Sequence, residues 1–585
     1  MEIKSLHESI SIQCKRYADK IAVIDYERKI TYWELEEMSS LIADRLLNDG
    51  IAPGMTVVVI ADRCLELIIV ALGVMKCGAI YVPVDMSYPT QRILNIIDDT
   101  KCNIIINISD HHLETYNGTI LTLEQLSLSK RDSDSMNQST FNGHIAYIIY
   151  TSGTTGKPKG VMVSNNAIMN TFEWMTDQFD INENDVIAHK TSISFTDSIW
   201  EIFWPLLNGA KISIINSKHA RDPKRMYEWM EQQRISFTQF VPSMLKVFVE
   251  YIEFKRIENP LSELRWVFNG GEQVGVNLVR RFYDCFKTAK YANIYGMTES
   301  AIYATCHVVE RESLRIWNSI PIGKPILNSS ILLLNEYNQI CSPFEKGEIC
   351  ITGVSLADGY WNDAELTKDK FTCLNTSNDR LYRSGDIGMS DDYGNYWFLG
   401  RKDNQVNVYG NRVELYEIEK NILEYDGISL TAVIPCKNWY GETYLVCYLE
   451  NDKVDVENLK VFLRDRLPNY MIPKEFHKIN ALPLTVNNKV DRKNLCELFK
   501  NEVSDDKAAL EKVSIKSVVH NIWNTILGID EISHDDDFFQ LGGDSLTLAR
   551  LQIELEKQGF SLSYDELLEH KTINQIVVLL ERMTQ

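Results

Sequence analysis

The sequence predicts an α/β protein with a large N-terminal α/β unit, a smaller α/β unit and a helical C-terminal region. The large unit is indicated by short apolar runs such as Thr56–Ile60 and Ile145–Tyr150, which alternate with helical stretches such as Tyr32–Asn48 up to about residue 400. This alternation is typical of strands crossed by helices that cover the faces of a sheet. The 585 residues exceed what one core holds, so we expect three or four compact units.

The rest of the chain changes character twice. Residues from about 403 to 498 contain two more strand-like runs, TAVIPC and TYLVCYLE, and indicate the smaller α/β unit. The polar stretch Asn501–Lys507 has the composition of a linker. After it, Leu548, Leu551 and Leu555 recur at spacings of three and four, as on a helix with one apolar stripe. We expect a small helical bundle over the last seventy or so residues.

Composition and charge exclude several classes of protein. The net charge of -21 argues against nucleic-acid binding, because phosphate contacts need clustered Lys and Arg. The twelve cysteines contain no CxxC pair, which indicates reduced thiols rather than a disulfide framework or a zinc site. The N-terminus lacks a signal-peptide pattern, and the longest apolar run, Leu67–Val84, is interrupted by Lys76, Gly78 and Pro83. We therefore expect a cytoplasmic protein without a membrane segment.

A glycine-rich loop follows the apolar run IAYIIY. Between Tyr150 and Gly160, three glycines let backbone N–H groups approach an anion, while four hydroxyls and two lysines supply donors and positive charge. The loop is not a Walker A motif, because neither lysine has the required glycine spacing and a following Ser or Thr. A flexible surface turn is the alternative to a triphosphate cradle. The candidate ATP ligands in the loop are Thr151, Ser152, Gly153, Thr154, Thr155, Gly156 and Lys159.

The same loop, TSGTTGKPKG, resembles the signature of the adenylate-forming superfamily of acyl-CoA synthetases, luciferases and nonribosomal peptide synthetase adenylation domains. Eight further motifs resemble this superfamily in the same order along the chain. They are ITYWEL, KCGAIYVPVD, NIYGMTES, GEICITG, YRSGDIG, GRKDNQVNVYGNRVELYEIE, LPNYMIP and NNKVDR. The resemblance implies an ATP-dependent reaction in which a carboxylic acid attacks the α-phosphate to form an acyl-adenylate. Positive charge must then offset the repulsion between two anions.

The motif NIYGMTES implies several nucleotide contacts. By the resemblance, Glu299 helps to hold Mg²⁺, Thr298 contacts the α-phosphate and Tyr295 stacks on adenine. The motif departs from the family at Met297, where Pro is usual, and the change removes the preset φ angle of proline but no ligand. The remaining nucleotide positions of the motif are Asn293 and Gly296.

Two later motifs imply the ribose contacts and the catalytic lysine. Asp386 has two acceptor oxygens suited to the ribose hydroxyls, and Arg401 reinforces it; the alternative for Asp386 is a turn residue. Lys489, in NNKVDR, is similar to the catalytic lysine of the family and bridges the substrate carboxylate and the α-phosphate. Without the resemblance, this lysine is an ordinary solvated charge.

The family reuses one site for two steps by rotating its small domain about a hinge residue, and Asp403 occupies the hinge position. Shortly after it, NVYGNR departs from the usual KIRG form, because Asn407 and Tyr409 replace basic residues. This departure affects the expected contacts of the thioester-forming state.

The segment FFQLGGDSL, residues 538–546, resembles the attachment motif of carrier proteins. Ser545 lies at a predicted helix N-terminus, after two glycines and an Asp able to cap it. The resemblance implies that a phosphopantetheinyl transferase attaches 4′-phosphopantetheine to the Ser545 hydroxyl. A condensation or other acyl-transferring enzyme then acts downstream in trans.

Together the motifs predict an ANL-type fold with four segments. These are an adenylation core (1–402), a mobile α+β subdomain (403–500), a linker (501–512) and a four-helix-bundle carrier (513–585). The function predicted first is an adenylation–carrier didomain that serves as a starter unit of nonribosomal peptide synthesis. The alternatives are a stand-alone acyl-CoA synthetase and a scaffold that only binds nucleotide.

The acid that is activated is indicated by SFTDSIWE. Enzymes of this family for α-amino acids carry Asp directly after the Phe, where it pairs with the substrate ammonium; here Thr196 takes that place and Asp197 follows. One helical residue turns a side chain by about 100° and shifts it by about 1.5 Å, which suits an amine on the β-carbon. Alternatively, Asp197 caps the helix Ser198–Leu207 and the substrate is an amine-free keto, hydroxy or aryl acid. The aligned pocket positions are Thr196, Asp197, Trp200, Gln239, Phe268, Gly270, Ile294, Ile302 and Tyr303.

Overall fold

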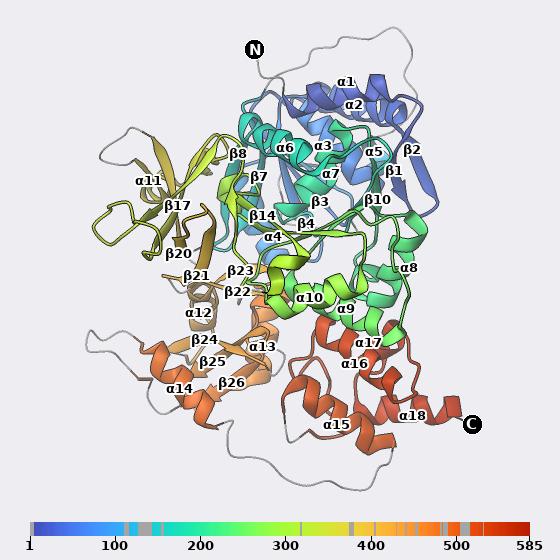
Figure 1. Cartoon of the computed structure of the whole chain (residues 1–585), viewed down its shortest axis with the longest axis vertical. Helices are drawn as coiled ribbons and strands as arrows, with labels where there is room; N and C mark the ends of the chain where they lie inside the picture. Colours follow the sequence, from blue (N-terminus) through green and yellow to red (C-terminus); the bar gives the residue numbers. More distant parts are fainter. Residues whose placement is uncertain are drawn as a thin grey trace.

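The computed structural model describes most of the chain. The described residues are 5–109, 116, 118–126, 143–153, 157–315, 317, 319–373, 379–402, 405–428, 430–438, 441–450, 454–479, 482–483, 490–502, 515–529 and 532–584. We refer to residues 5–402 as the core unit, 405–502 as the small unit and 515–584 as the helical unit. In Figure 1 the core unit lies above the other two, which sit side by side beneath it.

Two sheets of mainly parallel strands form the centre of the core unit, as the alternating pattern predicts. The first has the order β15-β14-β13-β12-β11-β9-β10-β1-β2 and the second the order β18-β8-β7-β4-β3-β5-β6. The first contains β1 (Ile21–Asp25), β2 (Arg28–Thr31), β9 (Val186–His189), β10 (Lys211–Ile214), β11 (Phe237–Phe240), β12 (Trp266–Asn269), β13 (Lys290–Tyr295), β14 (Thr305–Val309) and β15 (Lys324–Pro325). The second contains β3 (Thr56–Ala61), β4 (Ile80–Asp85), β5 (Ile104–Asn107), β6 (Thr119–Thr122), β7 (Ile145–Thr151), β8 (Lys159–Ser164) and β18 (Gly359–Tyr360).

Helices cover these sheets, so central strands such as β3 and β4 are buried along their whole length and read as continuous apolar runs. The predicted helix over 32–48 is confirmed as α2, which starts with a capping box between Thr31 and Glu34. The helices of the core unit are α1 (Leu6–Arg16), α2 (Tyr32–Asn48), α3 (Leu65–Lys76), α4 (Thr90–Thr100), α5 (Leu123–Leu126), α6 (Asn165–Phe179), α7 (Asp197–Leu207), α8 (Pro223–Gln233), α9 (Pro242–Lys255), α10 (Val276–Cys285) and α11 (Ala364–Lys370), with short 3-10 turns η1 (His219–Arg221), η2 (Thr298–Ser300) and η3 (Arg311–Arg315).

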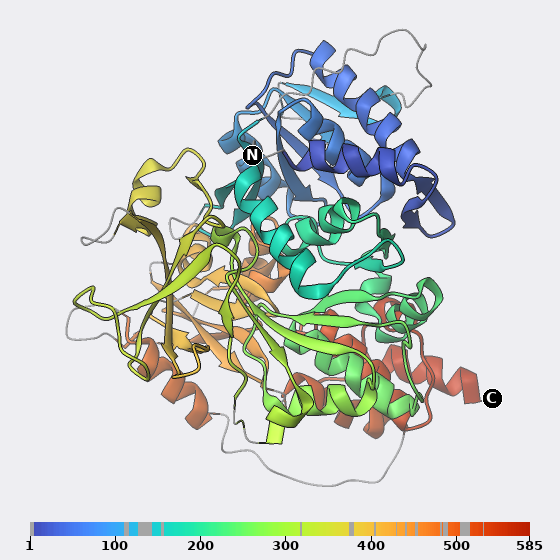
Figure 2. The same ribbon diagram turned by 45° about the horizontal axis from the view of Figure 1, so that its top comes forward.

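A third, antiparallel sheet of five strands completes the core unit, and the sequence pattern did not predict it as a separate layer. Its order is β16-β17-β20-β19, with β21 paired to β20. The strands are β16 (Ser329–Leu334), β17 (Gly347–Gly353), β19 (Phe371–Cys373), β20 (Arg380–Ser390) and β21 (Tyr396–Arg401). Figure 2 shows it standing beside the mainly parallel sheets.

The small unit combines a hairpin with a three-stranded sheet. Its elements are β22 (Gln405–Val408), β23 (Asn411–Glu414), α12 (Leu415–Leu423), β24 (Thr431–Lys437), β25 (Thr443–Leu449), α13 (Val456–Arg464), η4 (Asn469–Met471), β26 (Glu475–Lys478) and α14 (Arg492–Glu502). The two predicted strands are confirmed as β24 and β25. Helix α14 continues two residues into the predicted linker, because 501 and 502 are helical. Residues 503–512 of that linker lie outside the described residues.

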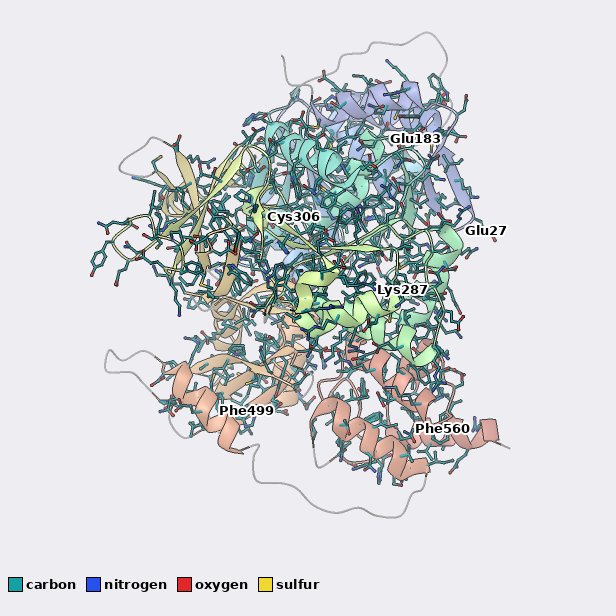
Figure 3. The ribbon with its side chains drawn as sticks, in the orientation of Figure 1. Glu27, Glu183, Lys287, Cys306, Phe499 and Phe560 are labelled. Atoms are coloured by element: carbon teal, nitrogen blue, oxygen red, sulfur yellow. The ribbon has the colours of Figure 1, made fainter. Side chains whose placement is uncertain are left out.

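The helical unit contains α15 (Ile515–Leu527), α16 (Ser545–Lys557), α17 (Tyr564–Glu569) and α18 (Ile573–Thr584), and in the described part of this segment no strand occurs. In Figure 3, Phe499 marks the small unit, Phe560 the helical unit and Cys306 the core unit. Within the described ranges, no helix combines the length and apolar character needed to cross a membrane.

Candidate active site

One cavity of about 270 Å³ lies where the core unit and the small unit meet. It brings together residues that the sequence assigned to two different tasks. Of the predicted nucleotide ligands it is lined by Thr151, Ser152, Asn293, Tyr295, Gly296, Thr298, Asp386 and Arg401. Of the predicted acid-binding residues it is lined by Thr196, Asp197, Gln239, Gly270, Ile294, Ile302 and Tyr303. A nucleotide and an acid can therefore meet in one chamber.

The phosphate loop connects the antiparallel strands β7 and β8, so its two ends lie side by side with Thr151 opposite Lys159. A Cβ at Gly153 would lie 2.0 Å from the carbonyl oxygen of Lys157, so the tight loop requires glycine. The buried Thr151 Oγ1 has no hydrogen-bond partner among the described residues, and it lines the cavity as a free donor for an anion. Thr154, Thr155 and Gly156 lie outside the described residues.

In this arrangement, the small unit already occupies part of the phosphate loop. The backbone N–H of Gly153 donates to Glu417 Oε2 over 3.0 Å, and Ser152 Oγ donates to the Arg412 carbonyl over 2.7 Å. The other carboxylate oxygen of Glu417 accepts from the buried Arg92 over 2.9 Å. A carboxylate of the small unit thus takes an N–H that the loop offers to anions.

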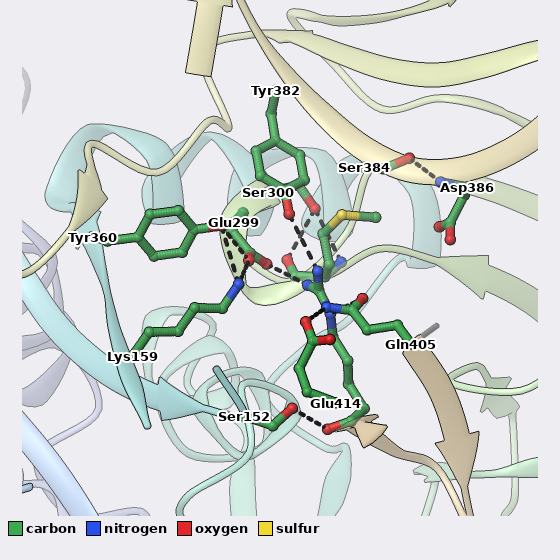
Figure 4. A network of polar contacts seen from close by, with 12 residues as sticks. Ser152, Lys159, Glu299, Ser300, Tyr360, Tyr382, Ser384, Asp386, Gln405 and Glu414 are labelled. Atoms are coloured by element: carbon green, nitrogen blue, oxygen red, sulfur yellow. Dashed lines mark hydrogen bonds and ion pairs between the residues drawn. The ribbon is translucent and has the colours of Figure 1, made fainter. Parts of the chain in front are cut away.

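Glu299, the predicted Mg²⁺ ligand, is wholly buried in a cage of donors (Figure 4). Lys159 Nζ lies 3.3 Å from Oε1, which also accepts from Tyr360 over 2.8 Å, and Arg412 Nη1 lies 2.8 Å from Oε2. Burial raises the pKa of Glu299, but Arg412 and Lys159 outweigh it and hold the pKa below its ordinary value. Burial lowers the pKa of Lys159 to about 8, against the opposing effect of Glu299.

The donor set at Glu299 fits Mg²⁺, which proteins usually hold by one or two carboxylates together with substrate phosphates. A carboxylate oxygen is a hard ligand, and Glu299 directly follows Thr298, which lines the nucleotide half of the cavity. Arg412 competes for the same carboxylate. A magnesium ion held by Glu299 would therefore compete with the Arg412 guanidinium.

Asp386 belongs to strand β20 rather than to a turn, and it faces Arg401 directly across the antiparallel β20–β21 pair. Arg401 Nη1 pairs with Asp386 Oδ1, and Tyr295 donates from its hydroxyl to Oδ2 over 2.6 Å. This cross-strand pairing fixes the carboxylate at the cavity wall, as expected for a ribose ligand.

The backbone conformation at Met297 is one that the usual proline of this motif could not adopt. Its φ is -157° and its ψ 166°, an extended conformation that precedes the short 3-10 turn η2. Proline is locked near φ of about -65° and cannot adopt this angle. The substitution therefore matches a local backbone that differs from a proline-preset turn.

The acid-binding half of the cavity is organised around Gln239. Trp200 Nε1 donates to Gln239 Oε1 over 2.8 Å, and the Tyr303 hydroxyl donates to the same oxygen over 2.7 Å. Because that oxygen accepts twice, the amide nitrogen must point the other way, and it donates to Asp197 Oδ1 over 2.7 Å. Burial raises the pKa of Asp197 to about 6, against the opposing bond from Gln239.

Asp197 does not act as a cap. Helix α7 begins at Asp197 itself, and no side-chain hydrogen bond caps its first turn. Thr196 already has helical angles, φ -60° and ψ -27°, so the one-residue displacement does turn the carboxylate by about 100° from the preceding position.

Two predicted wall residues do not line the cavity. Trp200 and Phe268 are fully buried one layer behind it, with ring centroids 5.2 Å apart, because the Gln239 amide lies in front of Trp200. Gly270 does line the cavity, but it is required by close backbone approach rather than by space for a ring. A Cβ there would lie 2.7 Å from the carbonyl oxygen of Ile294.

The β22–β23 hairpin spans from the cavity to the helical unit. Asn407 and Gly410 line the cavity, and Asn407 also donates to the Gly271 carbonyl. At the hairpin tip, Tyr409 has a left-handed φ of 51°, which is unusual for a bulky residue. Its ring centroid lies 5.4 Å from Lys474 Nζ, and the ring packs against an apolar cluster that combines residues of the core unit and the helical unit. The two departures from the usual KIRG form thus serve the cavity and the carrier contact.

The predicted helix start at Ser545 is confirmed, because α16 begins at this residue. Asp544 is the N-cap and accepts from the N–H groups of Leu546 and Thr547 over 3.0 and 2.9 Å. It also pairs with Lys474 of the small unit at 2.8 Å. Burial raises the pKa of Asp544, but Lys474 and these bonds outweigh it and lower the pKa to about 2. Ser545 itself is half-buried in this arrangement.

Lys489 and Asp403, the predicted catalytic lysine and hinge, lie outside the described residues. Sequence reasoning did not single out Arg412, Glu417 or Arg92. The first two belong to the quoted motif GRKDNQVNVYGNRVELYEIE, so a signal was present, but their partners lie more than 100 positions away in the chain.

Comparisons with known proteins agree with this geometry. A family model described as AMP-binding enzyme matches residues 10–361, and one described as phosphopantetheine attachment site matches residues 517–580. Tyrocidine synthase 1 of Brevibacillus parabrevis is 32% identical over 100% of this chain and 53% of its own length. Bacitracin synthase 1 of Bacillus licheniformis is 34% identical over 95% of this chain and 10% of its own. The chain thus spans between about a tenth and a half of the length of these relatives.

Solved structures are similar over nearly the whole chain. An NRPS protein containing adenylation and PCP domains, solved in its holo form with a vinylsulfonamide inhibitor, has a TM-score of 0.84 at 26% identity, covering 99% of this chain and 96% of that one. NpsA-ThdA, an artificially fused adenylation–PCP di-domain from Klebsiella oxytoca, has a TM-score of 0.74 at 25% identity, covering 82% and 95%. The matched families use ATP with Mg²⁺ and carry phosphopantetheine. The chain therefore belongs to the AMP-binding enzyme family, as an acid–AMP ligase of the nonribosomal peptide synthetase type joined to its own carrier domain.

Proposed function

We propose that the protein activates an amino acid, with the amine on the β-carbon, and loads it onto the phosphopantetheine arm of Ser545. The observation that carries this proposal is the single cavity in which Asp197 and the nucleotide residues face each other. Asp197 is a half-buried carboxylate held by Gln239 at the cavity wall, and it supplies the negative charge that an ammonium group requires.

The remaining wall suits an uncharged side chain. Ile294 and Ile302 are apolar, and the hydroxyl of Tyr303 is already used by Gln239. The Lys190 ammonium lies behind the wall over the Phe240 ring, at 4.5 Å, and does not line the cavity. The described cations that line the cavity, Arg92, Arg401 and Arg412, are each paired with a carboxylate. A second carboxylate on the acid would therefore have to compete with these pairs.

The chain's own residues supply positioning and charge for adenylation. Lys159 places an ammonium beside the phosphate loop, Asp386 holds the ribose, and Glu299 holds Mg²⁺ when Arg412 is withdrawn. Magnesium supplies charge neutralisation at the phosphates. We assign to Lys489 the bridge between the substrate carboxylate and the α-phosphate, as its motif implies. These groups act by electrostatic stabilisation rather than covalent chemistry.

We infer that the observed arrangement is the one that serves loading. The hairpin carries Arg412 into the nucleotide half of the cavity, while its tip at Tyr409 contacts the carrier beside Asp544. The arm supplies the thiol that takes the acyl group. We retain the division into a core (1–402), a mobile subdomain (403–500) hinged at Asp403, a linker (501–512) and a four-helix-bundle carrier (513–585).

The test uses full-length protein after treatment with a phosphopantetheinyl transferase. ATP–pyrophosphate exchange is measured with matched α-amino, β-amino, keto, hydroxy and aryl acids, and the acyl group on Ser545 is located by intact-protein and peptide mass spectrometry. We expect exchange and loading with β-amino acids. The variant Ser545→Ala should keep exchange and lose loading.

Three results contradict the proposal in distinct ways. Exchange that is strongest with α-amino or amine-free acids refutes the role of Asp197. Exchange accompanied by release of acyl-CoA, without acyl-Ser545, identifies a stand-alone acyl-CoA synthetase. Binding of ATP without exchange for any acid identifies a nucleotide-binding scaffold.

A further inference from the structure

Helix α16 of the helical unit carries one buried cationic side chain that contacts both other units. Arg550 lies on this helix and is 3% exposed. Its Nη1 is 2.8 Å from Glu442 Oε2 and its Nη2 is 2.5 Å from Glu442 Oε1, in the turn between β24 and β25 of the small unit. Its Nε is 3.8 Å from Oε2 of Glu250, on α9 of the core unit. One guanidinium therefore contacts carboxylates of two separate units.

The small-unit partner is held in place for this contact. The N–H of Glu442 donates to Asn438 Oδ1 over 2.9 Å, and Asn438 Nδ2 donates to Glu442 Oε2 over 3.0 Å. Glu442 itself is 5% exposed. The pair combines one charge-assisted hydrogen bond, from Nη1 to Oε2, with a second close ion contact, from Nη2 to Oε1. A buried pair of this kind forms only when the turn and α16 are correctly placed.

The other charged contacts of the helical unit are more exposed. Lys474–Asp544 is about one quarter exposed on each side, and Arg225–Asp565 is exposed further. Exposed pairs of this kind contribute little, because water and salt screen them. A buried charge that loses its partner is costly by comparison. Among the described ion pairs between the helical unit and the other two units, the Arg550–Glu442 pair is therefore the most buried.

We propose that Arg550 is a positioning residue that couples carrier docking to the orientation of the small unit. This inference rests on the proposed function, in which the small unit rotates between adenylation and loading. When the small unit turns away, Glu442 leaves with it, and a carrier seated on α9 would bury Arg550 against Glu250 alone. The carrier is thus accepted at the core only after the small unit has turned into the loading arrangement.

The decisive variants remove charge without removing length. Arg550→Met should slow loading of Ser545 from a preformed adenylate by on the order of 30-fold or more, since truncating one partner of a buried charge pair has effects of this size. ATP–pyrophosphate exchange should change less than twofold, because Arg550 does not line the cavity. Glu442→Gln should slow loading as well, and the double variant should be no slower than Arg550→Met alone.

Lys557→Met is the matched control, because Lys557 lies on the same helix but pairs only locally with Glu554 at 2.6 Å. It should load normally. Attachment of the pantetheine arm to Ser545 should be equal in all variants, which shows that the carrier remains folded. The proposal is wrong if Arg550→Met loads at the wild-type rate, if Lys557→Met is equally slow, or if the two interface variants act independently.

Hydrogen exchange separates this inference from the proposed function. In the full holo chain without substrate, Arg550→Met should raise amide exchange in α9 and in the β24–β25 turn relative to wild type, whether or not any tested acid is activated. If Arg550→Met leaves amide hydrogen exchange unchanged at both segments, the inference is overturned, even when the wild type loads an acid normally. The wild type could instead fail to load any acid while the difference in hydrogen exchange between it and Arg550→Met is present. That result refutes only the proposed function.

Discussion

Arg412, which lines the cavity, and the buried Glu299 are joined at 2.8 Å, although 113 positions separate them in the chain. The pair places a guanidinium on the carboxylate that would hold Mg²⁺, so the hairpin that carries Arg412 would compete with the metal for Glu299. In the proposed reaction, the two steps would differ in which cation neutralises this carboxylate.

Arg412→Gln should consequently affect the two steps unequally. Without its guanidinium, the hairpin loses its hold on Glu299 in the loading arrangement, and loading should fall by about tenfold or more because a charged hydrogen bond is removed. Pyrophosphate exchange should stay within about threefold of wild type. Single-turnover loading and exchange, measured on the same preparation, check this. Equal loss in both assays would assign Arg412 to the nucleotide site instead.

The Gly153–Glu417 bond leads to a prediction about pyrophosphate. The Glu417 carboxylate accepts the Gly153 N–H of the phosphate loop. Because it is negatively charged, it excludes a competing anion such as pyrophosphate from that N–H. Glu417→Gln keeps the shape, removes the charge and leaves Arg92 free to attract phosphate. Pyrophosphate should then inhibit loading at about tenfold lower concentration.

The matched control for this prediction is Glu424→Gln, because Glu424 is an exposed residue just after the same helix. Its inhibition curve should overlay that of the wild type. A double variant Arg92→Met, Glu417→Gln should return toward wild-type sensitivity. Identical pyrophosphate inhibition in Glu417→Gln and wild type would show that the phosphate loop is already closed to anions by other groups.

Local features of this fold were predictable from sequence, and long-range contacts were not. Helix α2 was predicted over Tyr32–Asn48, and β3 was predicted from its continuous apolar run; the structure adds that α2 starts with a capping box between Thr31 and Glu34. Such signals are contained within a few residues. The antiparallel sheet around β20 depends on pairings between distant segments, which no local periodicity reports.

The site shows the same division. The motifs identified the residues that line the cavity, but they did not separate Gln239, which faces it, from Trp200 and Phe268, which lie behind. That distinction depends on which side chains donate hydrogen bonds to the amide oxygen of Gln239. Likewise, the Arg550–Glu442 pair spans 108 positions and two units, so nothing near either residue predicts it.

Lys489→Ala should abolish pyrophosphate exchange and spare transfer to Ser545 from a supplied acyl-adenylate. The lysine is assigned to adenylation alone, and in the proposed loading arrangement Arg412 lines the nucleotide half of the cavity. Exchange and transfer are measured separately, with Lys478→Ala, a substitution of an exposed lysine at the end of β26, as control. Comparable loss of both steps in Lys489→Ala would contradict the assignment.

The pKa of Asp197 predicts a pH limb that depends on the substrate. Burial raises this pKa to about 6, so the carboxylate is charged above that pH and neutral below it. For an amine-bearing acid, kcat/KM should therefore fall about tenfold per pH unit below about 6, as the partner of the ammonium is lost. For an amine-free acid of the same shape the limb should be missing.

Asp197→Asn, which keeps the bonding shape without the charge, should lower kcat/KM for the amine-bearing acid at neutral pH and remove its acidic limb. An acidic limb that persists in Asp197→Asn must belong to another group, and Asp197 would then be a structural partner of Gln239 rather than a ligand of the substrate.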